Sequence, residues 1–379
     1  MNRKSRMRFL SVCAGAALAF QAPAAALAAT PEFGRTTEEW ARLRDNVLEY
    51  EELEDLIHEY NVTVLNNEQT YSQTMSGVSF EDFANQYRWQ AEDLYEQAGD
   101  AASDIETITY EMQARQAENS SVIDEQDAQT VRYENELTEK LLVMEAQSTM
   151  NSYYQLQQQL ISAQKQRELL AALVTSAQTR MSLQMATQSD VLTAQQNLQN
   201  ADAGIVTLQS QIEAARQKLI VMTGWKQDAQ PEICPLPEVD FERIAAIDMA
   251  ADLETARQND ITLKLDEYKA ARVSNGENKK IYEQNAKNDR EQIGVALTSA
   301  YQSLQQAKNA YDEAVLNMDV TSRSMTAAST QYGLGSISRL EYQQAEVSFV
   351  SAQTNLEIAR MALLQALENY EWVVKGVRS

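Results

Sequence analysis

Proline is nearly absent from this sequence. The 379 residues include only 5 prolines, and none occurs between Pro31 and Pro231 or after Pro237. Because proline breaks helices, two proline-free stretches this long, rich in Ala, Gln, Glu and Leu, predict long helices. No segment alternates polar and apolar residues for long enough to predict a sheet or a barrel strand. The sequence therefore predicts an all-α fold.

Cysteine and histidine are also scarce, with two cysteines and one histidine. Cys234 has no partner for an internal disulfide once the leader that contains Cys13 is removed, so we interpret it as a small buried residue, with a disulfide between chains as the alternative. His58 lies in an acidic segment, and a solvated helix face explains it more simply than a metal site, which needs further ligands. No catalytic or nucleotide-binding motif is present. The sequence thus predicts no enzyme, no metal and no cofactor.

Basic residues are outnumbered by acidic ones, with 32 Lys and Arg against 55 Asp and Glu and a net charge of −23. This balance argues against nucleic acid as a partner and for repulsion by anionic lipid surfaces. The most acidic stretch, residues 49–55, is interpreted as a solvated helix face. A cation-selective pore lining is the alternative interpretation of that stretch.

The first 28 residues have the pattern of a secretory signal peptide. Four basic residues precede an apolar stretch that ends in the small-x-small sequence Ala26-Leu27-Ala28. Pro23 and Gln21 interrupt this stretch, which disfavours a membrane anchor. Removing residues 1–28 removes four cations and no anions, so the net charge of −23 becomes −27. We therefore predict an exported chain.

A short proline-rich segment divides the sequence into two halves. Residues 230–237 contain three prolines and cannot continue a helix. About 350 residues follow the leader, for which two domains are the usual expectation. We predict a first helical repeat over residues 29–225, a linker over 226–240 and a second helical repeat over 241–379.

Each half ends in a heptad pattern, the period of a left-handed coiled coil. The first run has apolar core positions at Ala194, Leu198, Ala201, Ile205, Leu208, Ile212, Ala215, Leu219 and Met222. Every one of these positions recurs 151 residues later, from Ala345 to Val373, and a third run extends from Ile293 to Met318. Alanine alternating with a larger residue suits a wall of closely packed helices, although a soluble bundle core has the same spacing.

The residues before the two heptad runs break the pattern in the same way. Residues 181–192 read MSLQMATQSDVL, and residues 332–341 read YGLGSISRLE. At the offset of 151, Gly335 aligns with Gln184, Ser338 with Thr187, Glu341 with Asp190 and Ala345 with Ala194.

The composition of these breaks is that of a helix end followed by a helix start. Glycine tolerates the positive φ of a C-cap, serine or threonine caps the next helix, and the acidic residue three positions later completes a capping box. Each break is therefore predicted to be a tight turn between two long antiparallel helices, which an ordinary helical hairpin would also contain.

The doubled turn resembles that of the TolC family of outer-membrane efflux proteins. The family pattern is Tyr-x-x-Gly-x-x-Ser/Thr-x-x-Asp/Glu, then an alanine, a heptad run and a Leu/Thr-Gly ending. The second copy keeps Tyr332, Gly335, Ser338, Glu341 and Ala345, while the first keeps Thr187, Asp190, Val191, Leu192, Ala194 and Gln195, ends in Met222-Thr223-Gly224-Trp225, and has Met181 and Gln184 in place of Tyr and Gly. The resemblance is good over residues 170–240 and 290–375 and weak over residues 30–125.

The resemblance implies a trimer whose helical hairpins form a hollow duct in the cell envelope, at the outer membrane. It also implies that the hairpin tips bind a periplasmic adaptor, which links the duct to an ABC or proton-driven pump. The adaptor-docking residues carried over are Met181, Gln184, Thr187, Asp190, Val191, Tyr332, Gly335, Ser338, Arg339, Leu340 and Glu341.

The sequence departs from the family where barrel strands would stand. Residues 261–272 lead through Ser274-Asn275-Gly276 directly into the next helix, which leaves room only for a turn. In the first repeat, pairing Val62 with Ile261 gives an offset of 199, so 48 extra residues precede its tip; they predict helix and loop. Two interpretations fit this departure. Either the protein is a barrel-less relative that forms an extracytoplasmic duct, or the extra residues contain an attachment device. The rival functions are a non-conducting extracytoplasmic coiled-coil protein and, last, a pump adaptor.

Overall fold

The computed structural model describes residues 34–76, 80–101, 103–123, 128–273 and 276–378, so the expected leader, 1–28, lies outside the described residues. The predicted all-α class is confirmed. The helices are α1 (Thr37–Leu43), η2 (Tyr50–Glu52), α2 (Leu53–Tyr60), α3 (Val62–Ser76), α4 (Phe80–Gly99), α5 (Asp104–Ile123), α6 (Ala128–Ser182), α7 (Gln188–Met222), α8 (Phe241–Ala245), α9 (Met249–Asn259), α10 (Ile261–Arg272), α11 (Gly276–Gly333) and α12 (Arg339–Val374). No helix within these ranges is both long enough and apolar enough to cross a membrane.

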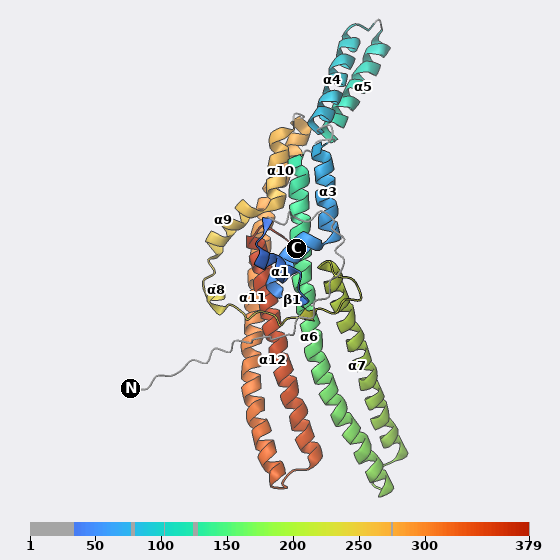
Figure 1. Cartoon of the computed structure of the whole chain (residues 1–379), viewed down its shortest axis with the longest axis vertical. Coiled ribbons are helices and arrows are strands. Elements are labelled where there is room, and N and C mark those ends of the chain that lie inside the picture. Colours follow the sequence, from blue (N-terminus) through green and yellow to red (C-terminus); the bar gives the residue numbers. More distant parts are fainter. Residues whose placement is uncertain (1–33, 77–79, 102, 124–127, 274–275, 379) are drawn as a thin grey trace, which may run out of the picture.

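Two long helical hairpins, α6–α7 and α11–α12, run side by side, and both turns lie at the same end of the molecule (Figure 1). Helix α12 packs against α11 on one side and against α6 on the other. Among the described helices, α7 packs along one neighbour, α6. The central position of α12 explains why Ala352, Leu363 and Tyr370 are all buried. By contrast, the heptad core of α7 is only half-buried from Ala194 to Ala215, because a single neighbouring helix covers it.

The main apolar core lies near the middle of the molecule, where the N-terminal segment crosses the long helices. Its largest fully buried side chains include Leu48, Ile57, Leu219 and Tyr370. Strand β1 (Val47–Leu48) pairs in parallel with β2 (Glu232–Ile233) of the linker, which anchors the linker to the N-terminal segment. The Tyr370 hydroxyl donates a 2.7 Å hydrogen bond to the Asp252 carboxylate, so the polar group of this buried ring is satisfied.

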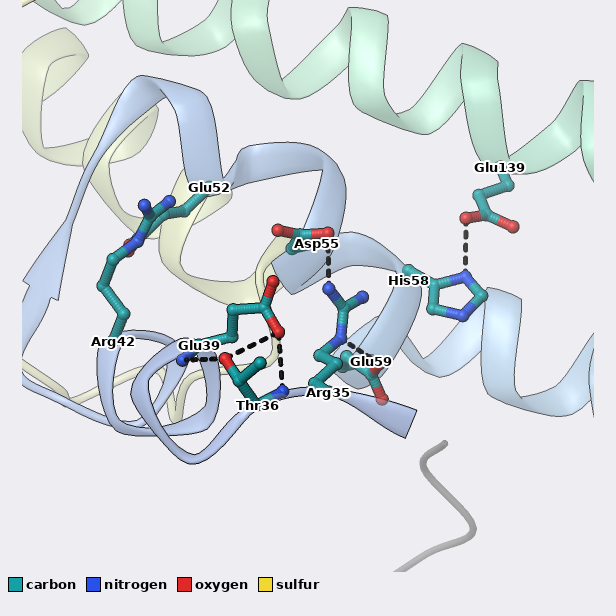
Figure 2. Close-up of polar contacts among 9 residues, drawn as sticks. All are labelled: Arg35, Thr36, Glu39, Arg42, Glu52, Asp55, His58, Glu59 and Glu139. Carbon is teal, nitrogen blue, oxygen red and sulfur yellow. Dashed lines mark hydrogen bonds and ion pairs between the residues drawn. The ribbon is translucent and has the colours of Figure 1, made fainter. Parts of the chain in front are cut away.

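The acidic stretch at residues 49–55 is not a uniformly solvated face, so that interpretation was wrong in part. Glu52 and the nearby Glu59 are each only 1% exposed. Figure 2 shows the reason: Arg42 pairs with Glu52, and Arg35 bridges Asp55 and Glu59 at 2.8 Å each. Buried carboxylates are tolerated because these arginines neutralise them.

His58 also has a defined partner instead of lying on an acidic face in solvent. Its Nδ1 atom is 2.8 Å from a carboxylate oxygen of Glu139 on α6 (Figure 2). The hydrogen bond to Glu139 raises the pKa of His58, against the opposing effect of burial. The pair attaches α2 to the long helix α6.

The extra residues of the first repeat, for which helix and loop were predicted, are helical over most of the part that the structure describes, and they build a third hairpin. Helices α4 and α5 pack on each other and project from the end opposite to the two long turns (Figure 1). Small residues line their contact, where Ala91 and Ala114 are 3% and 0% exposed. Larger apolar side chains face away from it: Trp89 is 68% exposed, and Ile105, Ile108 and Met112 are 78%, 58% and 65% exposed.

The far end of each long hairpin closes against a kink between two short helices. The α2–α3 kink lies at Asn61 and the α9–α10 kink at Asp260, and each residue both ends one helix and begins the next. Asn61 donates a 2.8 Å hydrogen bond to the Met222 carbonyl at the end of α7, and Asn259 donates a 3.0 Å bond to Val374 at the end of α12.

A glycine with positive φ follows each of these helix ends, Gly224 at 82° and Gly376 at 92°. A Cβ atom on either would overlap the kink that it faces, 2.2 Å from the Tyr60 Cβ in the first case and 2.3 Å from the Asn259 carbonyl oxygen in the second. Glycine is therefore required at both positions for conformation and for close approach. We name the two contacts the first and second junctions.

Candidate functional site

The two turns at the shared end of the long hairpins have the same backbone geometry. Gln184 has a φ of 64° and Gly335 a φ of 69°, at the offset of 151 expected from the sequence. In the first turn, the N–H of Gln184 donates to Met181 O at 2.9 Å and that of Met185 to Arg180 O at 2.7 Å. In the second turn, Gly335 donates to Tyr332 at 3.0 Å and Ser336 to Gln331 at 2.8 Å. Both helices thus end in a Schellman-type C-cap.

The helices that leave the turns begin with matching capping boxes. The Asp190 N–H donates a 3.2 Å hydrogen bond to the Thr187 hydroxyl, and the Asp190 carboxylate accepts a 2.7 Å bond from the Thr187 N–H. Ser338 and Glu341 form the same two bonds, also at 3.2 and 2.7 Å. Hydrogen bonds from the backbone N–H and then from the hydroxyl of the capping residue, Thr187 or Ser338, lower the pKa of Asp190 and of Glu341. Both carboxylates therefore stay ionised at the positive ends of their helices.

Gln184 is the one described non-glycine residue with a positive φ. A left-handed backbone costs a residue with a Cβ about 1 kcal/mol. The first turn carries this cost and the second avoids it with Gly335, although both have the same hydrogen bonds. The cap geometry is therefore imposed by the hairpin and does not depend on glycine.

Most of the residues predicted to dock a partner are exposed at the two turns. Gln184, Thr187, Asp190, Gly335, Ser338, Arg339 and Glu341 are exposed, as is Tyr332, which stacks on Tyr342 with ring centroids 4.8 Å apart. Met181 and Leu340 are half-buried. Val191 is only 6% exposed, so it supports the turn from within and offers little surface to a partner.

The most exposed apolar residues of the turns were not among the predicted site residues. Leu183 and Leu334 are 64% and 76% exposed, and they occupy equivalent positions at the offset of 151. Met185 and Leu192 add further exposed apolar surface to the first turn, at 65% and 56%. The available signal was a leucine directly before the positive-φ residue of each turn, where no core exists to bury it. We call the exposed apolar residues Leu183, Met185, Leu192 and Leu334 the tip patch.

The chain has the fold of the TolC-like outer-membrane channels, as the doubled turn indicated. It superposes on a membrane protein from Pseudomonas aeruginosa with a TM-score of 0.52 and 12% identity, over 84% of this chain and 93% of that one. For the Campylobacter jejuni outer membrane channel CmeC, the TM-score is 0.50 with 11% identity, over 96% and 95% of the two chains. For CusC, a protein that forms a transmembrane channel, it is 0.51 with 12% identity, over 86% and 92%. No protein-family model and no curated protein matches the sequence.

Proposed function

We propose that this chain is one subunit of a trimeric export conduit in the cell envelope, whose hairpin tips bind a pump adaptor. The observation that carries the proposal is the pair of equivalent capped turns, exposed at one end of two parallel hairpins, in a TolC-like fold. Two of the structural neighbours named above, CmeC and CusC, are channel proteins, which supports a conduit over an enzyme. Export through a leader at residues 1–28 would bring the chain to the envelope.

We also propose that the chain is organised as two repeats, residues 29–225 and 241–379, joined by the linker 226–240. The first and second junctions support this division, because each repeat has its own kink, its own asparagine bond and its own close-approach glycine. The two tip turns support it in the same way.

Apolar residues on the two edge helices support self-association. Val206 of α7 is 65% exposed, and Val295 and Leu316 of α11 are 64% and 69% exposed. Val295 and Leu316 are three heptads apart, and Val206 is two heptads from Leu192, so each pair lies on one face of its helix. A head-to-tail contact of α7 in one copy with α11 in the next would cover both faces, and three such contacts would close a ring.

The trimer predicts a specific cross-link. A Val206→Cys and Leu316→Cys double variant, in a Cys234→Ala background, is expected to give covalent dimers and trimers with a short bis-maleimide. The two positions lie at similar distances from their tips, 22 residues after Gln184 and 19 before Gly335. Denaturing gels and light scattering of the untreated protein provide the measurements.

The matched controls are the two single-cysteine variants, which cannot join α7 to α11. Cross-linking in the double variant that never exceeds that of the single variants would contradict this interface. A stable monomer at micromolar concentration in both buffer and detergent would contradict the trimer itself. A trimer without ion conductance in bilayers would favour the rival, a non-conducting coiled-coil protein.

The tip patch is the proposed contact for an adaptor. Leu183 and Leu334 stand at the apex of the two turns, between polar caps whose hydrogen bonds are already satisfied within the turn. Burying two or more exposed leucines in a partner is worth about 1.5–3 kcal/mol each. The polar docking residues of the two turns, such as Gln184 and Glu341, would then set the orientation of the adaptor.

A Leu183→Asp and Leu334→Asp double variant is therefore expected to weaken binding to a hairpin-bearing adaptor of the same organism at least a hundredfold, since two buried apolar contacts become desolvated charges. Circular dichroism should show unchanged helicity, because both side chains are exposed. Trp89→Asp, an equally exposed apolar position at the opposite end, is the control and should bind normally. Equal binding by all three proteins would remove the tip patch from the site.

A further inference from the structure

A cluster of carboxylates surrounds Arg378, which follows α12, at the second junction. The Arg378 Nε lies 2.8 Å from Asp260 Oδ2, and its Nη2 donates to both Asp260 Oδ1 and Asp289 Oδ1 at 3.1 Å. Asp260 and Asp289 are 1% and 8% exposed. One arginine thus joins the α9–α10 kink to helix α11.

A third carboxylate completes this cluster. The Asp266 carboxyl group, from the second turn of α10, is within hydrogen-bonding reach of Asp289. The Asp289 Oδ2 atom is fully buried and has no hydrogen-bond partner among the described residues. Two carboxylates can form a hydrogen bond only if one of them is protonated, because an ionised carboxylate only accepts.

We propose that the Asp266 carboxyl group keeps a proton and donates it to the buried Oδ2 of Asp289, and that this hydrogen bond holds α10 against α11, so that the second junction is tighter in mildly acidic than in neutral solution. The proposal rests on contacts within one chain. It therefore does not depend on the trimer or on the conduit function.

The surrounding charges leave the pair without a second neutralising group. Arg378 is already occupied by Asp260 and Asp289. The other nearby cation, Lys269 of α10, lies 3.5 Å from Glu134 of α6 and is shared with that carboxylate. With both Asp266 and Asp289 ionised, two like charges would meet in a poorly solvated site, which favours binding of a proton.

The first repeat has no such carboxylate pair at the equivalent positions. At the offset of 199, Asn61 replaces Asp260 and Asn67 replaces Asp266; at 151, Thr138 replaces Asp289. Helix α3 nevertheless packs on α6 here, and Asn135 of α6 donates a 3.2 Å hydrogen bond to the backbone carbonyl of Asn67. The fold thus accepts neutral groups here, and the acidic cluster is specific to the second repeat.

Burial, followed by the charge and hydrogen bond of Asp289, raises the pKa of Asp266 from 3.8 to about 6. A folded-state pKa above the unfolded value means that protonation stabilises the folded junction. This contribution is fully present below pH 3.8 and is lost as the pH rises through about 6.

Hydrogen exchange of the α10 and α11 amides, normalised to the intrinsic rate at each pH, tests the proposal on the full chain. Between pH 7.5 and pH 5, the wild-type protection factor is expected to rise about tenfold, the value that linkage gives for these two pKa values. In Asp266→Asn, which imitates the protonated acid, protection should already be high at pH 7.5 and should change less than twofold. Asp289→Asn should also abolish the pH dependence, because it removes the carboxylate that accepts the hydrogen bond from Asp266.

Glu267→Gln is the matched control, because it removes the adjacent carboxylate of α10, which pairs with Arg290 at the surface. It should keep the wild-type pH dependence. The proposal is overturned by wild-type protection that does not change between the two pH values. It is equally overturned by a tenfold change that persists in Asp266→Asn.

Discussion

Replacing Gly376 with alanine is expected to lower the free energy of unfolding by about 2–4 kcal/mol, the sum of a left-handed backbone with a Cβ and of overpacking. At a φ of 92°, the new Cβ would lie 2.3 Å from the Asn259 carbonyl oxygen and 2.4 Å from its carbon. Both are backbone atoms at the α9–α10 kink, so they cannot move aside as a side chain would. The second junction would have to open.

Gly335→Ala separates the two contributions. Its φ of 69° is also left-handed, but nothing lies within 4 Å of the position where a Cβ would stand. In this control, the free energy of unfolding should fall by only about 1 kcal/mol. Urea denaturation followed by circular dichroism, at one fixed chain concentration, gives both values. Equal losses in the two variants would show that the close approach at Gly376 contributes nothing.

Replacing Arg378 with alanine is expected to lower the free energy of unfolding by about 3–5 kcal/mol at pH 7.5, because removing one partner leaves buried charges uncompensated. The Arg378 side chain is 18% exposed, and those of Asp260 and Asp289 are 2% and 12% exposed, so solvent screens the cluster weakly. The loss should shrink as the pH falls, because burial raises the pKa of Asp260 and its protonation then removes an unpaired charge. Denaturation midpoints measured from pH 5 to pH 8 test this directly.

Arg378→Lys and the triple variant Arg378→Ala, Asp260→Asn, Asp289→Asn identify the cause. Lysine keeps the charge but cannot reproduce the two-pronged contact with Asp260, so a partial loss is expected. The triple variant has the neutral character of the first repeat and should regain most of the stability. A triple variant no more stable than Arg378→Ala would show that packing, and not charge, accounts for the loss.

The tip turns illustrate how much of the site could be predicted. The positive φ at Gly335 and the capping boxes of Thr187 and Ser338 follow from short-range patterns, and the structure contains them at the expected positions. The same φ at Gln184 has no sequence mark of its own and could be expected only from its alignment with Gly335. That the turns bind a partner stays a prediction. The exposure of Leu183 and Leu334 was missed, because a leucine carries no sequence mark that says whether a neighbouring element covers it.

The acidic residues show the opposite case. A run of carboxylates at residues 49–55 predicted solvation, yet Glu52 is buried against Arg42. Asp266 and Asp289 gave no sequence signal at all, since they are 23 residues apart and meet only because α10 folds back on α11. Charge can be counted from a sequence, but its neutralisation depends on which distant groups are brought together.

The sequence by itself determined the helices, their turns and their pairing into hairpins, because these depend on hydrogen bonds and side-chain contacts within a few residues or on a regular heptad period. Only the tertiary structure decided the two junctions, the position of α12 between α11 and α6, and the third hairpin at the far end. Gly224 and Tyr60, which meet at the first junction, are 164 residues apart in the sequence. No local pattern could reveal a contact over that separation. Such contacts form because burying apolar surface rewards any chain segments that fit together, whatever their separation in sequence.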